Sequence, residues 1–94
     1  MTTQNSIEKD LTIVNQRGLH ARASAKLVKL VETFEADVLV SKDGQTVGGT
    51  SIMGLMMLAA SPGCCINVSV SGLEAEAALD AISELVENGF GETD

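Results

Sequence analysis

The sequence predicts an α+β fold, an open-faced two-layer sandwich in which a four-stranded antiparallel sheet carries three helices on one face. Short stretches with alternating apolar and polar residues, typical of strands, follow one another along the chain with stretches of helical spacing between them. Their order is β-α-β-β-α-β-α, and helices that cover one face of such a sheet make a two-layer domain. The 94 residues are enough for one hydrophobic core and too few for two.

The first part of the chain predicts a tail, a strand and a helix. We expect a flexible N-terminal tail over 1–8, and then a strand over 9–15 in which Leu11 and Ile13 alternate with polar neighbours. Residues 21–34 change to helical spacing. The apolar residues that share one face of this helix are Ala23, Leu27, Leu30, Val31 and Phe34.

The middle of the chain predicts a hairpin and a short apolar helix. Residues 36–41 and 45–48 have the composition of strands, and the Asp-Gly pair at 43–44 between them is a strong hairpin signal. Residues 51–58 predict a short helix with Ser51 as its N-cap, because a serine hydroxyl accepts a hydrogen bond from a free backbone N–H of the first helical turn.

The last part predicts a strand and a long amphipathic helix. Residues 64–70 alternate, and residues 74–88 have helical spacing that ends at Gly89, a residue suited to the position after a helix. We therefore expect one domain over 9–90 and a flexible C-terminal tail over 91–94. The inward-facing residues are Ile66, Val68 and Val70 on the strand, and Ala75, Leu79, Ile82 and Val86 on the helix.

Composition excludes several kinds of partner. The net charge of −7 opposes binding to nucleic acid, and Phe34 and Phe90 are the only aromatic residues on which bases could stack. No apolar run is long enough for a membrane span, and the polar start lacks the apolar region of a signal peptide. We expect a cytoplasmic monomer without direct membrane insertion. The adjacent Cys64 and Cys65 are expected to be free thiols, and we expect no metal and no cofactor, because no second ligand pair is visible.

Charge is distributed unevenly along the chain. Residues 15–31 carry four basic residues and no acid, whereas 74–94 carry seven acids and no base. A local basic patch on an acidic protein indicates a face built for an anion or an acidic partner. The four basic residues are Arg17, Arg22, Lys26 and Lys29.

The only histidine, His20, falls where the strand-to-helix connection meets the N-terminus of the first predicted helix. The first N–H groups of a helix lack internal partners and carry partial positive charge, so an anion on His20 would be stabilised there. Arg22 and Arg17 can add charge-assisted hydrogen bonds to such an anion. The plainer alternative is that His20 is a solvated cap without chemistry.

Residues 17–25, Arg-Gly-Leu-His-Ala-Arg-Ala-Ser-Ala, resemble the active-site segment of the HPr family, the histidine phosphocarriers of the bacterial phosphotransferase system. The resemblance covers about residues 7 to 90. It implies that Enzyme I, using phosphoenolpyruvate, phosphorylates Nδ1 of His20, that Arg22 supports the phosphoryl group, and that an enzyme IIA protein accepts it. The segment departs from the family at Ala23, where members often carry proline. Alanine is a strong helix former, so we expect the first turn to form.

A second segment, 49–56, is similar to the regulatory-serine segment of the same family. This resemblance makes Ser51 the target of an HPr kinase/phosphorylase, where such an enzyme exists. A helix N-cap can carry a phosphate without unfolding the helix, because the helix dipole favours the anion. The alternative is that Ser51 is only a cap.

The short helix has too many apolar residues for one buried face. Leu55 and Leu58 suit the core, so its other apolar residues are expected to be partly exposed, as on a binding surface for several partners. We expect a docking surface on both sides of His20. Its residues are Ala21, Ala25 and Lys26 on one side, and Ile52, Met53 and Met56 on the other.

Three alternatives remain open at this point. The order of elements alone also permits a ferredoxin-like binding or regulatory module without chemistry. A redox or metal carrier that uses Cys64 and Cys65 is weaker, because their spacing is wrong for C-x-x-C chemistry. Within the resembled family, the carrier serves either sugar uptake or a nitrogen-type regulatory branch, and the motif sequences resemble α-proteobacterial carriers, where the regulatory branch is common.

Overall fold

The computed structural model describes residues 6–92 as four strands, three α-helices and one 3₁₀ turn. The order of the elements is the predicted β-α-β-β-α-β-α, followed by the turn, which was not predicted. In chain order they are β1 (Ser6–Thr12), α1 (Ala21–Val31), β2 (Asp37–Lys42), β3 (Gln45–Gly48), α2 (Ile52–Met57), β4 (Cys65–Ser71), α3 (Ala75–Glu87) and η1 (Gly89–Gly91).

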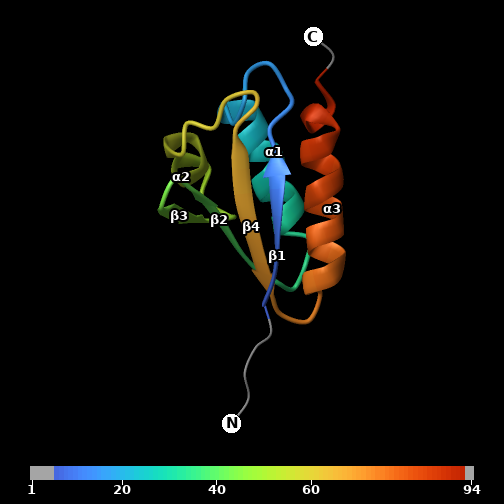
Figure 1. Cartoon of the computed structure of the whole chain (residues 1–94). Coiled ribbons are helices and arrows are strands. Elements are labelled where there is room, and N and C mark those ends of the chain that lie inside the picture. Colours follow the sequence, from blue (N-terminus) through green and yellow to red (C-terminus); the bar gives the residue numbers. More distant parts are fainter. Residues whose placement is uncertain (1–5, 93–94) are drawn as a thin grey trace.

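The strands form one sheet in the order β1-β4-β2-β3, and all three pairings are antiparallel. Helices α1 and α3 lie side by side on one face of this sheet, and α2 packs against α1 and β3 (Figure 1). The predicted open-faced two-layer sandwich is therefore confirmed. The connection from β1 to α1 and the C-terminal end of α3 lie at the same end of the molecule (Figure 1). The start of α1 and the segment that follows α3 are therefore neighbours.

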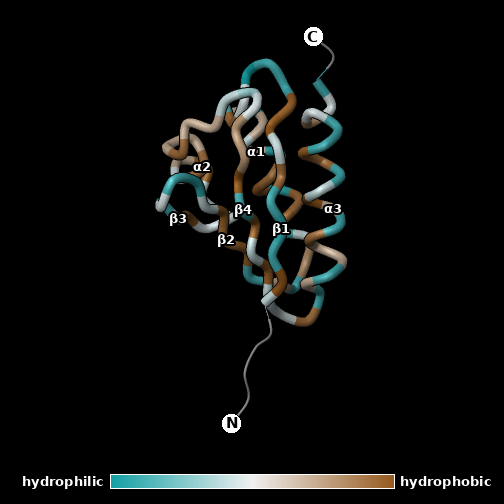
Figure 2. Tube along the Cα trace, in the orientation of Figure 1, coloured by the Kyte–Doolittle hydropathy of each residue, from teal (hydrophilic) through white to brown (hydrophobic). Residues whose placement is uncertain are grey.

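The core fills the space between the sheet and the helices. Along β4, buried hydrophobic residues alternate with more exposed ones, so that one face of the strand enters the core, whereas β1 contributes Leu11 and, in part, Ile7 (Figure 2). Every apolar residue predicted to face inward on the last strand and helix is buried: Ile66, Val68, Val70, Ala75, Leu79, Ile82 and Val86. Within the described part of the chain, none of the helices is both long and apolar enough to cross a membrane.

Several boundaries differ from the prediction. The first strand runs over Ser6–Thr12 and not over 9–15, because its pairing with β4 continues to Ser6 opposite Ser71. The predicted flexible tail over 1–8 is thus wrong for 6–8, and residues 1–5 lie outside the described residues. Helix α1 ends at Val31 and not at 34, because the N–H groups of Thr33 and Phe34 bond to carbonyls three residues back, which tightens the chain into turns.

The C-terminal segment differs most. Gly89 follows α3 with φ +64°, as expected of a residue that stops a helix. The chain then folds back in η1 and buries Phe90 completely, so the segment 91–94, predicted as a tail, begins with ordered residues. Glu92 contacts His20 at the N-terminal end of α1, and residues 93–94 lie outside the described residues.

Candidate functional site

The loop before α1 is fixed by backbone contacts that set the position of His20. Gly18 has φ +65°, and a Cβ at this position would lie 2.1 Å from the carbonyl oxygen of Ala60, so only glycine fits. The Leu19 N–H donates to the same Ala60 oxygen at 2.9 Å, and the Leu19 side chain is buried. The loop therefore reaches the helix with little freedom, and His20 becomes its N-cap, as predicted.

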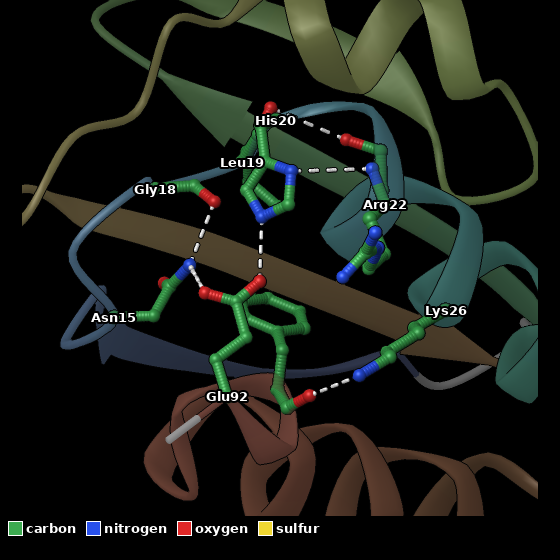
Figure 3. A network of polar contacts seen from close by, with 9 residues as sticks. Asn15, Gly18, Leu19, His20, Arg22, Lys26 and Glu92 are labelled. Atoms are coloured by element: carbon green, nitrogen blue, oxygen red, sulfur yellow. Dashed lines mark hydrogen bonds and ion pairs between the residues drawn. The ribbon is translucent and has the colours of Figure 1, made fainter. Parts of the chain in front are cut away.

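The His20 ring is held at both nitrogens. Its Nδ1 accepts the backbone N–H of Arg22 at 3.2 Å, and its Nε2 lies 2.5 Å from Oε2 of Glu92 (Figure 3). A carboxylate oxygen only accepts, so Nε2 carries the proton, and a nitrogen that accepts an N–H carries a lone pair. The two contacts together assign the neutral tautomer with the proton on Nε2 and the lone pair on Nδ1.

Glu92 is itself held in place. Its Oε1 accepts a hydrogen bond from Asn15 Nδ2 at 3.1 Å, and Asn15 Nδ2 also donates to the Gly18 carbonyl at 2.9 Å (Figure 3). Only 12% of the Glu92 side chain is exposed. The hydrogen bond from His20 and then that from Asn15 hold the pKa of the Glu92 carboxyl below its usual value, although desolvation acts in the opposite direction.

The basic residues differ in their contacts. Lys26 donates from Nζ to the Phe90 carbonyl at 2.7 Å, so this predicted docking residue also ties η1 to α1. Arg22 and Arg17 are exposed, and within residues 6–92 neither guanidinium makes a hydrogen bond or an ion pair. Ala23, at the position where the resembled family often has proline, is buried in a first turn that forms without it.

Ser51 and the apolar residues of α2 lie on a second element that packs against α1. The Ser51 hydroxyl accepts the Gly54 N–H at 3.0 Å, which confirms its predicted place as N-cap. Leu55 and Leu58 are buried, as predicted, whereas Ile52, Met53 and Met56 are 39%, 73% and 41% exposed. We call the exposed residues Ile52, Met53 and Met56, together with Ala21, Ala25 and Lys26 of α1, the docking patch. Ala21 and Lys26 are exposed, and Ala25 is half-buried.

The two cysteines lie apart from this site. Both are free; Cys65 is exposed and Cys64 partly buried. Hydrogen bonds from Ser61 lower the pKa of the Cys64 thiol.

Sequence reasoning missed Glu92 and Asn15. The sequence predicts Asn15 at the end of a strand and Glu92 in a tail, and neither position suggests contact with a histidine 72 residues away from Glu92. One signal was available. Phe90, one of two aromatic residues, stands between two glycines just after a predicted helix stop, and so large an apolar residue indicates a chain that turns back to the core.

Comparisons of sequence and of structure match this chain to one family. The family model described as the PTS HPr component phosphorylation site matches residues 7–88. The phosphocarrier protein HPr of Xylella fastidiosa (strain Temecula1) is 46% identical over 92% of this chain and 97% of its own length. The phosphocarrier protein NPr of Shewanella violacea is 40% identical, over 92% and 94%. A crystal structure of HPr from Thermoanaerobacter tengcongensis has a TM-score of 0.88 and 38% identity, over 94% of this chain and 99% of that one. The chain therefore belongs to the HPr family of phosphocarrier proteins of the phosphotransferase system.

Proposed function

We propose that the chain accepts a phosphoryl group from phosphorylated Enzyme I on Nδ1 of His20 and passes it to an enzyme IIA protein. The observation that carries the proposal is the lone pair on Nδ1, presented at the N-terminus of α1. A neutral imidazole nitrogen is a nucleophile, and a helix N-terminus stabilises the anion that the reaction places there. The working form we propose is a cytoplasmic monomer.

The contacts of His20 account for the steps of transfer. The Nδ1 lone pair attacks phosphorus in line with the leaving group, and the Arg22 N–H that now points at this lone pair becomes a donor to a phosphoryl oxygen. In a loose transition state the charge is spread over the phosphoryl oxygens, where the exposed guanidinium groups of Arg22 and Arg17 can reach it. The His20 side chain is partly exposed, at 22%, and both arginines are exposed, so donor and acceptor proteins can approach the site from the solvent side.

The test uses Enzyme I, phosphoenolpyruvate and the purified chain. We expect a mass gain of one phosphoryl group that is lost in acid, and we expect none in His20→Ala. A wild-type chain that stays unphosphorylated would favour the alternative, a ferredoxin-like binding or regulatory module. Subsequent incubation with candidate enzyme IIA proteins of sugar and nitrogen type identifies the acceptor and so assigns the branch. We favour the nitrogen-type branch.

We further propose that Ser51 is a regulatory phosphorylation site of an HPr kinase/phosphorylase. It is exposed, it caps α2, and α2 carries half of the docking patch. A phosphate at this position would add negative charge where Enzyme I is expected to dock. Incubation with the kinase and mass spectrometry of wild type and Ser51→Ala tests this. Equal incorporation in both proteins would remove Ser51 from the proposal.

A further inference from the structure

The C-terminal turn places an acid on the histidine that we propose to be phosphorylated. Phe90 is fully buried, its carbonyl accepts a hydrogen bond from Lys26, and the next residue but one, Glu92, contacts Nε2 of His20 (Figure 3). Three separate interactions thus hold Glu92: the buried ring of Phe90, the Lys26 contact and the Asn15 hydrogen bond. So many contacts in the short segment after α3 indicate that the position of Glu92 matters.

We propose that Glu92 is a positioning residue for phosphoryl transfer, which keeps the Nε2 proton in place and balances the charge that the ring gains when Nδ1 is phosphorylated. This inference rests on the proposed function. It concerns an acid in the segment after α3, which reaches the ring at the nitrogen that does not react.

The site requires a carboxylate. Two N–H donors, from His20 Nε2 and Asn15 Nδ2, converge on the two oxygens of Glu92 at 2.5 and 3.1 Å. A glutamine would offer one acceptor oxygen and an NH₂ group, so it could satisfy only one of these donors without rearrangement. The depressed pKa of the carboxyl is consistent with this, because it keeps Glu92 charged at neutral pH.

The charge balance of the transfer explains the second role. When Nδ1 forms the bond to phosphorus, the bond between phosphorus and the donor atom breaks, and the donor atom keeps that electron pair. Nε2 keeps its proton, so the neutral ring becomes a phosphorylated imidazolium. A hydrogen bond to a carboxylate is stronger from a charged donor than from a neutral one. Glu92 therefore stabilises the phosphorylated ring more than the free ring, as the aspartate of a Ser-His-Asp triad does for its imidazolium.

The first measurement needs no phosphotransfer. We expect NMR of the unphosphorylated wild-type chain with ¹⁵N-labelled histidine to show a hydrogen-bonded Nε2 proton that exchanges slowly with water. The signal should be lost in Glu92→Ala and unchanged in Glu84→Ala, a matched change of an exposed acid on α3. If the signal is unchanged in Glu92→Ala, the proposal is overturned.

The second measurement is the equilibrium constant for phosphoryl transfer from Enzyme I. We expect it to fall about three- to tenfold in both Glu92→Ala and Glu92→Gln, the difference between a hydrogen bond to a charged and to a neutral group. Glu84→Gln should leave it unchanged. Glutamine fills the same volume as glutamate, so a lower equilibrium constant in Glu92→Gln is due to the lost charge. The Glu92→Gln variant also keeps the test possible if Glu92→Ala folds poorly.

The two proposals fail separately. A wild-type chain that takes no phosphoryl group on His20 refutes the proposed function. A wild-type chain that is phosphorylated on His20, with the same equilibrium constant in Glu92→Gln, refutes the role of Glu92 and leaves the carrier function intact.

Discussion

At the scale of single residues, the two nitrogens of the His20 ring have different partners. Nδ1 accepts the backbone N–H of the exposed Arg22 at the helix N-terminus, where we propose that the phosphoryl group is received. Nε2 faces Glu92, which is mostly covered. Because each nitrogen has its own partner, a change on one side should affect the chemistry in a different way from a change on the other.

Arg22→Ala should slow phosphorylation of His20 by Enzyme I by about ten- to a hundredfold, less than the loss of a fully buried transition-state donor, because Arg22 is exposed. Arg22→Lys should retain part of the rate, since a lysine keeps the charge but not the paired N–H geometry. Rapid-quench kinetics measures both. The control is Lys29→Ala, which removes an exposed basic residue near the other end of α1. An equal loss of rate in this variant would mean that Arg22 acts only through the overall charge of the protein.

The contact between His20 and Glu92 predicts a pH dependence. The pKa of the folded Glu92 carboxyl is lowered, first by the His20 hydrogen bond and then by that of Asn15. The pKa of a glutamate in an unfolded chain is about 4.3. Above that pH the stabilisation from Glu92 is fully present, and it is lost as the pH falls through the lower folded pKa, because the unfolded chain binds the proton first. Carboxyl ¹³C NMR of Glu92 should give a midpoint below about 4.3. A midpoint at or above that value would contradict the contact.

At the scale of elements, the loop before α1 decides where His20 stands. Gly18→Ala should destabilise the chain by more than about 1–2 kcal/mol, the cost of a left-handed backbone alone, because its Cβ would also overlap the Ala60 carbonyl. Urea unfolding measures the difference. Gly44→Ala is the matched control, since Gly44 also has a positive φ, +82°, but has open space around it. Equal losses in the two variants would mean that the Ala60 contact does not hold the loop.

The elements that follow from local rules could be predicted, and those that depend on distant contacts could not. The N-caps His20 and Ser51 lie at changes from one residue spacing to another, and the structure places both as caps. The buried face of α3 follows from its helical spacing. Glu92, by contrast, reaches His20 only after Phe90 has entered a core formed by the whole fold. The start of β1 at Ser6 likewise depends on its pairing with Ser71 of β4.

The exposed apolar part of α2 predicts an effect on partner binding. Met53→Asp should weaken binding to Enzyme I by about tenfold or more, because it places a charge in the centre of an apolar contact. The fold should persist, since Met53 is 73% exposed. Isothermal titration with Enzyme I measures the affinity. Leu73→Asp is the control: Leu73 is 89% exposed and lies in the turn between β4 and α3, away from α2. Equal weakening in both variants would argue against the docking patch.

At the scale of the whole molecule, the four basic residues of 15–31 lie in the loop before α1 and along α1, in a chain with a net charge of −7. Helices α1 and α3 bring this basic region and the acidic α3 side by side, and the hydrogen bond from Lys26 to the Phe90 carbonyl joins α1 to η1, the turn after α3. The site is thus a local region of positive charge on an acidic surface. We expect such a region to attract an acidic or phosphorylated partner, and the acidic surface around it to repel that partner.

The sheet has two edges, and both are built to avoid pairing with a second copy. The edge strand β3 has only four residues, and the edge strand β1 carries the charged run Glu8, Lys9 and Asp10. Short and charged edges resist strand addition, and a net charge of −7 adds repulsion between copies. We therefore expect sedimentation velocity to show one species with the chain mass of 9.8 kDa over a wide concentration range. Measurement at high salt, which screens the net charge, distinguishes the two causes. If the chain stays monomeric at high salt, the short and charged edge strands are sufficient to prevent association. A species of twice the mass at low salt would refute the prediction.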